Sequence, residues 1–300
     1  MSAGLPPRAV VITRATDYED LLARHGTREQ ARFFLASRGQ GLDEIEASHR
    51  EIHAAVATVL AAIPQRWRRT RARRTDLDRF LFEPEDVIVA VGQDGLVANV
   101  AKYLTGQAVV GVCPSPSSGG GVLARHAPET TADLLPLVAE GSAKIEERTM
   151  VEATTGDGQR LVALNEIFVG HQTHQSARYR VGIGARRERH SSSGLIVATG
   201  TGATGWARSI HRSRTITTEL PSPTARRLAF FVREAFPSAT TGTTIDDGSL
   251  GPDERLEVTS EMNEGGVVFG DGIEVDHIDF HWGTALTIGI ASAALRLVQG

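Results

Sequence analysis

The sequence is poor in cysteine and lysine, and these gaps exclude two kinds of site. Its 300 residues include a single cysteine, Cys113, which rules out an internal disulfide and a metal site built from several cysteines. Lys102 and Lys144 are the only lysines, and no Gly-x4-Gly-Lys-[Ser/Thr] motif occurs, so a P-loop with its phosphate-binding lysine is excluded. Any phosphate would have to be bound by backbone N–H groups, arginines or a metal ion.

Long apolar runs and a strong excess of one charge are also missing. No stretch approaches the roughly 20 apolar residues of a membrane-spanning helix, and the first residues lack the basic start and apolar core of a signal peptide. The formal net charge of -4 gives no general case for nucleic-acid binding. We therefore expect a cytoplasmic protein that binds neither nucleic acid nor membrane.

The first part of the chain alternates between expected strands and helices, which is typical of an α/β domain with a parallel sheet. One helix is indicated by an apolar stripe that also carries His49, running from Leu42 to Leu60. The expected strands are 8–13, 66–74, 87–91 and 108–112, and the expected helices are 19–37, 42–63, 76–81 and 97–104. We assign residues 1–125 to this α/β domain.

The strand expected at 66–74 consists mainly of arginine. Its basic face is open to two interpretations, a contact with nucleic acid or phosphate and a solvated edge strand. We favour the edge strand, because charged side chains at a sheet edge oppose aggregation.

Residues 126–300 are assigned to a β-rich, β-sandwich-like second domain. A helix is expected at 131–140, which Pro136 would interrupt. Short apolar or alternating runs then dominate, many of them separated by glycine-bearing turns. The expected strands are 148–153, 159–164, 167–170, 178–183, 194–199, 255–259, 266–269, 285–290 and 294–298. The division leaves the C-terminal end free to pack back on the first domain.

A carboxylate in a glycine-flanked turn is the most informative feature of the chain. The apolar strand 87–91 ends in Gly92-Gln93-Asp94-Gly95, and a helix follows. Ligands of open α/β sheets bind at the carboxyl ends of the strands, and flanking glycines let backbone N–H groups approach a phosphate. The alternative is an ordinary turn in which Asp94 caps the helix. This segment alone leaves both interpretations open.

A second glycine-rich segment, Gly200-Thr-Gly-Ala-Thr-Gly205, lies between an apolar strand and a short expected helix at 206–212. It matches the G-x-G-x-x-G dinucleotide fingerprint. A Rossmann unit would add a longer helix, another buried strand and an acid about 20 residues further on, and none of these follows here. We therefore predict a polyphosphate or ribose site at a helix start without a Rossmann unit.

Asn165 and Glu166 form an adjacent amide and acid where two short strands join. Neighbours in a strand point to opposite faces, so both would meet one ligand only through a local irregularity. The segment Asp271-Gly272 is typical of a plain hairpin turn.

Metal and hydrolase chemistry have weaker support. The histidine pairs 171/174 and 277/281 lack a matching acid or cysteine cluster, so polar surface or cleft roles are favoured over metal binding. No Gly-x-Ser-x-Gly elbow occurs, which argues against a Ser-His-Asp hydrolase.

Taken in order, these segments resemble the NAD kinase family, in the superfamily shared with diacylglycerol and sphingosine kinases. The family's Gly-Gly-Asp-Gly turn corresponds to residues 92–95, its Asn-Glu pair to 165–166, its Thr-Pro-Thr-Gly-Ser-Thr-Ala-Tyr motif to 199–206 and its late Asp-Gly to 271–272. The resemblance covers residues 85 to 300, and the longer loop after Val112 is similar to that of the mitochondrial-type branch. It implies an NAD kinase-like fold with the ligand cleft between an α/β nucleotide-binding domain, residues 1–125, and a β-sandwich-like NAD-binding domain, residues 126–300.

The resemblance implies an ATP-dependent kinase that converts NAD and ATP to NADP and ADP. Asp94 would be the general base on the ribose 2′-hydroxyl of NAD, and Asn165 and Glu166 would hold its adenosine end. Gly92 and Gly95 would admit the ATP phosphates, which would carry Mg²⁺, with no protein metal ligands expected. The residues expected to line the nucleotide site are Thr199, Thr201, Gly202, Thr204 and Trp206. A homodimer or homotetramer is also implied.

The chain departs from the family pattern in ways that keep other functions open. The residues that replace the family's Gly, Thr, Asn, Asp, Pro, Ala and Tyr are Gln93, Leu96, Cys113, Ser193, Gly200, Gly205 and Trp206. Acids that hold substrate in the mitochondrial-type branch are absent near Ser115 and Gly120. The alternatives are a same-fold kinase for another nucleoside, sugar or lipid alcohol and a non-catalytic dinucleotide-binding protein. Polyphosphate as donor and NADH as acceptor also stay open.

Overall fold

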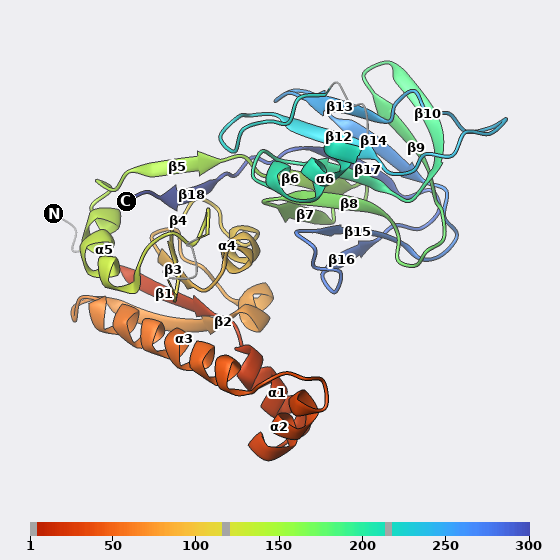
Figure 1. Ribbon diagram of the computed structural model, residues 1–300. Coiled ribbons are helices and arrows are strands. Elements are labelled where there is room, and N and C mark those ends of the chain that lie inside the picture. The colour runs from red at the N-terminus through yellow and green to blue at the C-terminus, as the bar shows by residue number, and fades with distance from the viewer. Residues whose placement is uncertain (1–4, 116–120, 214–217) are drawn as a thin grey trace. The chain divides into compact units, whose positions relative to one another are not determined.

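The computed structural model describes residues 5–115, 121–213 and 218–300 and divides the chain into two compact units (Figure 1). The N-terminal unit comprises Met1–Glu146 and Arg296–Gly300, and the C-terminal unit comprises Glu147–Leu295. Residues 126–146 therefore cluster with the first unit, whereas the sequence-based boundary lies between residues 125 and 126. The last residues of the chain also belong to the first unit.

The N-terminal unit is built on a six-stranded sheet in the order β2-β1-β3-β4-β18-β5. Its strands are β1 (Arg8–Thr13), β2 (Arg68–Arg73), β3 (Val87–Val91), β4 (Ala108–Val112), β5 (Ile145–Arg148) and β18 (Leu295–Val298). The pairs β1–β2, β1–β3, β3–β4 and β4–β18 are parallel, which confirms the predicted parallel sheet. The arginine-rich strand β2 lies at the sheet edge, as expected.

Helices cover this sheet with apolar side chains. They are α1 (Asp17–His25), α2 (Arg28–Ala36), α3 (Asp43–Ala62), α4 (Asp94–Ala101) and α5 (Thr131–Ala139), with the 3-10 helices η1 (Arg74–Arg79) and η3 (Pro128–Thr130). Val56 and Val59 of α3 and Leu135 of α5 pack in one cluster with Val11 and Val89 of the sheet. Figure 1 shows α3 running along β1 and β2.

Two helix predictions are wrong in detail. The single helix expected at 19–37 is divided into α1 and α2, because Gly26 ends the first with a φ of 79° and Thr27 caps the second by accepting the Gln30 N–H. Conversely, Pro136 lies inside α5 without interrupting it. It sits in the second turn, and the helix continues to Ala139 although the proline has no N–H to donate within it.

The C-terminal unit is a sandwich of two six-stranded sheets, ordered β10-β9-β14-β17-β6-β7 and β13-β12-β11-β8-β15-β16. Side chains from both sheets, such as Tyr179 and Ile288 of the first and Val169 and Phe230 of the second, form one buried core. The strands of the first sheet are β6 (Val151–Thr155), β7 (Arg160–Ala163), β9 (Ala177–Ile183), β10 (Arg186–Ser192), β14 (Leu256–Ser260) and β17 (Ala285–Ile290). Those of the second are β8 (Glu166–His171), β11 (Leu195–Ala198), β12 (Leu228–Val232), β13 (Asp247–Leu250), β15 (Gly266–Gly270) and β16 (His277–Asp279).

The outer face of the second sheet is covered by α6 (Trp206–Ser213), which follows the 3-10 turn η4 (Gly202–Thr204). Ala207 and Ile210 of α6 pack against Phe168, Ile196 and Phe231 of this face. β11 is antiparallel to both of its neighbours, β8 and β12, so the predicted absence of a Rossmann unit is confirmed. No helix in the described part of the chain is long and apolar enough to cross a membrane.

Candidate functional site

The Asp94 turn lies at the carboxyl end of β3, as the sequence predicts. All five residues of β3 are buried, and α4 begins at Asp94 with Gln93 as its N-cap. The N–H of Gly92 continues the sheet by donating to the Val112 carbonyl at 2.9 Å, so this N–H is already used. A Cβ placed on Gly95 would meet nothing within 4 Å, which leaves open space above its backbone.

The Asp94 carboxylate is held by the backbone of the segment that returns after β4. Its Oδ1 accepts the N–H groups of Leu123 and Ala124 at 2.9 and 2.8 Å, and its Oδ2 accepts the Val122 N–H at 2.8 Å. Gly121 must be glycine here, because a Cβ would stand 1.9 Å from Oδ1. Asp94 thus fixes the 121–124 segment, a role that neither the base nor the cap interpretation includes.

A cavity of about 740 Å³ opens beside this turn within the N-terminal unit. Its wall includes Gly92, Asp94, Cys113 and Ser115, together with Thr16 and His49 from the α1 and α3 side. Cys113 and Ser115, two of the departures from the family pattern, therefore lie in the same wall as the proposed base. Gly120 lies outside the described residues.

In the C-terminal unit, Asp271 organises the Asn165-Glu166 corner. Its two carboxylate oxygens accept the N–H groups of Leu164 at 3.1 Å and Asn165 at 2.6 Å. Its own N–H donates to the Glu166 carbonyl at 3.0 Å. Asp271 adopts a φ of 55°, which is uncommon outside glycine and directs the chain out of β15. The predicted turn at Asp271-Gly272 does lie between the antiparallel strands β15 and β16. The Asp271 side chain also joins the end of β15 to the residues that precede β8.

The strict alternation of side chains along a strand does not apply to the Asn165-Glu166 pair. Asn165 lies in a bend before β8, and Glu166 is the first residue of that strand. Burial raises the pKa of the Glu166 carboxyl to about 7, and the nearby negative charge of Asp271 adds to the shift. At neutral pH this carboxyl therefore exists in both protonation states, and a ligand that prefers one of them can shift the balance.

The glycine-rich loop after β11 is attached to the same corner. The Thr199 hydroxyl donates to the Leu164 carbonyl at 2.5 Å and accepts the N–H groups of Thr201 and Gly202 at 3.1 and 3.3 Å. A Cβ on Gly202 would stand 2.1 Å from the Asn165 carbonyl oxygen, so only glycine permits this approach. Thr199 is fully buried, which makes it a residue that holds the loop in place.

Two threonines of this loop differ in their hydrogen bonds. Thr201 is 7% exposed, and its Oγ1 is buried with no partner among the described residues. A buried hydroxyl in that state indicates a missing partner, such as a water or a ligand. The exposed Thr204 uses its hydroxyl to bond the Thr201 carbonyl at 3.2 Å.

Aromatic side chains stack together at the start of α6. The ring of Trp206 stacks on Phe168, with centroids 5.8 Å apart, and the Arg233 guanidinium lies 5.1 Å from the Trp206 ring centre. These three residues line a cavity of about 540 Å³ with Ser193 and His171. Phe168 is two residues beyond Glu166 in β8, so both lie on the same face of the strand.

The structure thus gathers residues 164–166, 199–202 and 271 into one corner of the C-terminal unit, and Gly92, Asp94 and Gly95 into one turn of the N-terminal unit. Sequence reasoning missed the carboxylate of Asp271 as an organiser and the amides of 122–124 as donors to Asp94. Of these, only Asp271 had a readable signal, since an Asp at a hairpin turn is able to bond nearby backbone N–H groups.

No protein-family model and no curated protein matches the sequence. Solved structures match along nearly all of it. Yeast NADH kinase in complex with NADH superposes with a TM-score of 0.60 and 14% identity, covering 98% of this chain and 84% of that one. An NAD kinase from Archaeoglobus fulgidus in complex with ATP gives a TM-score of 0.57 and 18% identity, covering 97% and 93%. The chain therefore has the NAD kinase fold, which confirms the fold expected from its motifs.

Proposed function

We propose that the chain is an ATP-dependent NAD kinase, which transfers the γ-phosphoryl group of ATP to the 2′-hydroxyl of the adenosine ribose of NAD. The observation that carries this proposal is the corner of the C-terminal unit. Segments more than 100 residues apart, as 164–166 and 271 are, converge there, and one buried hydroxyl of the attached loop, Thr201 Oγ1, has no hydrogen-bond partner among the residues that the structure describes. The fold shared with kinases solved with NADH and with ATP supports the same assignment.

The adenosine end of NAD is assigned to this corner. Ribose hydroxyls donate to a carboxylate, so the ionised form of Glu166 would accept them in charge-assisted hydrogen bonds. Thr201 would supply its hydroxyl, while Thr199 and Gly202 keep the loop against Asn165. Trp206 and Phe168 line the neighbouring cavity, and aromatic side chains of this kind stack on nucleobases.

Asp94 is assigned as the general base. An ionised carboxylate has about four acceptor positions, and three are filled by backbone N–H groups here. The position that remains is on Oδ2, and we propose that it accepts the proton of the attacking hydroxyl. The oxygen then attacks the γ-phosphorus, the bond to the ADP oxygen breaks, and the proton leaves Asp94 for solvent. The amides keep the carboxylate in one orientation, and phosphoryl transfer depends on such positioning.

The residues around Asp94 also fit a magnesium ion that is carried by ATP. Because most of the acceptor positions of Asp94 are engaged by amides, this carboxylate is poorly suited to ligate a metal directly. Mg²⁺ characteristically keeps several waters and binds through substrate phosphates. When bound, it would neutralise charge that develops on the transferred group.

The proposal is tested by incubating purified protein with NAD and ATP-Mg and measuring NADP with an NADP-specific dehydrogenase. Formation of NADP and ADP in equal amounts is the expected result. No NADP, with a well-folded protein that still binds nucleotide by calorimetry, would contradict it. NADH as acceptor and polyphosphate as donor are tested in the same assay.

A second candidate, a same-fold kinase for another alcohol, is favoured by one observation. Cys113 and Ser115 line the cavity beside Asp94 where the mitochondrial-type pattern has other polar or acidic groups. If NADP does not form, ADP release with a panel of nucleosides and sugars would identify this alternative.

A further inference from the structure

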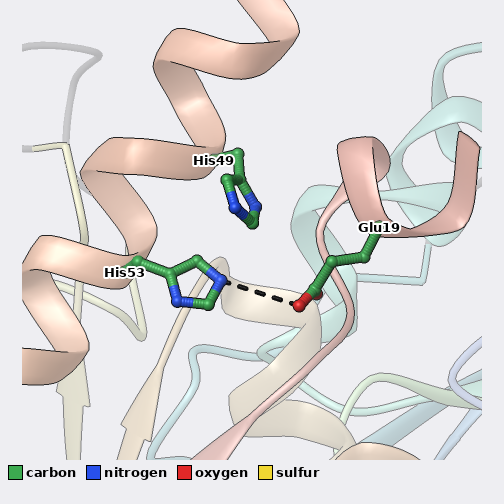
Figure 2. Close-up of side chains that lie close together, drawn as sticks. All are labelled: Glu19, His49 and His53. Carbon is green, nitrogen blue, oxygen red and sulfur yellow. Dashed lines mark ion pairs between the residues drawn. The ribbon is translucent and has the colours of Figure 1, made fainter. Parts of the chain in front are cut away.

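Two helices of the N-terminal unit bring two histidines and a glutamate together, and one of these residues, His49, also lines the cavity beside Asp94. Glu19 lies in the first turn of α1, and His49 and His53 lie one turn apart on α3. Figure 2 shows all three side chains converging between the helices. Sequence reasoning considered two other histidine pairs for metal binding. His277 and His281 lie 3.5 and 3.9 Å from the carboxylate of Asp279, but neither pair belongs to a group of three whose ligand atoms all lie within 4.8 Å of one another in the described part of the chain.

The spacing of these groups is close to that of a metal site. One ligand atom from each of the three residues lies within 4.8 Å of the other two. Nε2 of His53 is 3.6 Å from Oε1 of Glu19. Ligand atoms about 2.0–2.2 Å from a tetrahedral metal ion are about 3.3–3.6 Å apart, so that pair already has the required distance. A side-chain adjustment of roughly 1 Å would bring His49 to the same spacing.

Thr16 fixes the orientation of two of the three side chains. The Thr16 N–H donates to Glu19 Oε2 at 2.8 Å, which leaves Oε1 directed at His53. The Thr16 hydroxyl lies 2.8 Å from Nδ1 of His49, which leaves Nε2 of that ring open. Metal-binding histidines commonly donate their second ring N–H to an oxygen in this way, and the bond selects the tautomer.

The surroundings of Glu19 stabilise its carboxylate in the charged form. The pKa of Glu19 is lowered, chiefly by the Thr16 N–H, with further contributions from His53, His49 and Arg73 that outweigh its partial burial.

We propose that Glu19, His49 and His53 bind one divalent transition-metal ion of the zinc class. Imidazole nitrogens suit Zn²⁺, Co²⁺ or Ni²⁺, whereas Mg²⁺ and Ca²⁺ prefer oxygen ligands. Three protein ligands leave a fourth tetrahedral position for water. The ion would cross-link α1 to α3. The proposal rests on these three side chains and does not depend on the proposed function.

The test uses the full chain, freed of metal with a chelator, and Co²⁺ as a visible probe. A saturable absorption band of tetrahedral Co²⁺ is expected, which Zn²⁺ displaces. His53→Ala should weaken Co²⁺ binding by at least about 10–100-fold, the usual loss for disturbing such a site. His53 is a safe position to change, because its side chain is 52% exposed. Glu19→Gln should weaken binding too, and Gln retains an acceptor oxygen for the Thr16 N–H.

A matched control removes two histidines at the same sequence spacing, His277→Ala with His281→Ala, from the C-terminal unit. This variant should bind Co²⁺ like the unchanged protein and should still gain thermal stability from Zn²⁺, whereas His53→Ala should not. No saturable Co²⁺ binding would overturn the proposal. So would equal binding by the unchanged protein and the folded His53→Ala protein, or an equal loss in the control.

Discussion

Asp94 and Glu166 are both proposed to act on one substrate, yet the two units surround these carboxylates very differently. Asp94 accepts three backbone N–H groups at 2.8–2.9 Å. Glu166 is buried beside the like charge of Asp271, and its pKa is raised to about 7. One unit therefore surrounds a carboxylate with donors, whereas the other removes it from water and places a second carboxylate nearby.

The two environments suit different roles for Asp94 and Glu166. Amide donors fix the direction of Asp94, which suits a group that must meet one hydroxyl in one geometry. Glu166 instead carries a free-energy cost of ionisation, which hydrogen bonds from a ligand would offset. We therefore expect changes at Asp94 to act on turnover and changes at Glu166 to act on affinity and its pH dependence.

The largest effect is expected for Asp94→Asn. The amide keeps the shape of the side chain but cannot accept a proton, so turnover should fall by roughly 10²–10⁴-fold, the worth of a positioned general base. The variant should also lose about 1–3 kcal/mol of stability, because its NH₂ group would face a backbone N–H. Initial rates of NADP formation below the melting range measure the first effect, and urea unfolding measures the second.

Gly121→Ala is the matched control for this variant. It retains the carboxylate but places a methyl group against Oδ1, so it should disturb the amide contacts and cost stability. If Asp94 is the base, Gly121→Ala should lose less activity than Asp94→Asn at comparable stability. If Asp94 only holds the loop, both variants should turn over at near the normal rate while folded.

Glu166→Gln should have the next largest effect, on NAD affinity. A hydrogen bond to an ionised carboxylate contributes roughly 1.5–3 kcal/mol, so NAD should bind about 10–100-fold more weakly at pH 8. The deficit should shrink at pH 6, where Glu166 is mostly protonated in the free protein. Calorimetry at both pH values measures it, with Glu264→Gln at an exposed position of the same unit as control. Equal affinities at pH 8 would remove Glu166 from the site.

The raised pKa of Glu166 also predicts the pH dependence of stability. The folded pKa of about 7 lies above the usual 4.5, so the fold favours the protonated acid. Below pH 4.5 there is no penalty, and as pH rises through 7 the unfolded state gains relative stability. Glu166→Gln removes this loss, so its stability relative to the unchanged protein should rise by roughly 2 kcal/mol between pH 5 and pH 8. Urea unfolding at both pH values would refute the shift if the difference stays constant.

The smallest effect is expected for Thr201→Val. The hydroxyl has no partner among the described residues, so its removal should leave the free protein equally stable or slightly more stable. NAD affinity should fall by about 0.5–1.5 kcal/mol if the hydroxyl binds the nucleotide. Thr199→Val is the matched comparison, because its hydroxyl is bonded at Leu164 and its loss should cost about 1–3 kcal/mol of stability. Thermal melts and calorimetry on the two variants separate the roles.

The sequence predicts best those strands whose burial is evident from their own apolar residues. The strands at 8–13, 87–91 and 108–112 have the expected bounds, because continuous apolar runs indicate burial on both faces. β10 was not expected, since its charged sequence has no apolar alternation and it is held at a sheet edge by pairing with β9. β12 was also not identified, although Leu228–Val232 is a continuous apolar run and was readable.

The candidate site shows the same difference between features set by local sequence and features set by distant residues. The positions of Asp94 at a strand end and of Asn165-Glu166 at a strand junction follow from local pattern. The Asp271 bond to the Asn165 N–H joins residues 106 positions apart, and the Ala124 bond to Asp94 joins residues 30 apart. Such pairings depend on the order of the strands in the sheets. No local sequence pattern near either residue indicates that order.

The place of β18 has a consequence for the order of folding during synthesis. This strand lies between β4 and β5 in the N-terminal sheet, although it is the last strand to be made. The C-terminal unit needs only residues 147–295, so it is able to fold while the N-terminal sheet still lacks an interior strand. A released chain that ends before residue 295 would contain all the strands of the sandwich but would leave the β4 edge of the N-terminal sheet unpaired, and such an edge is prone to aggregate.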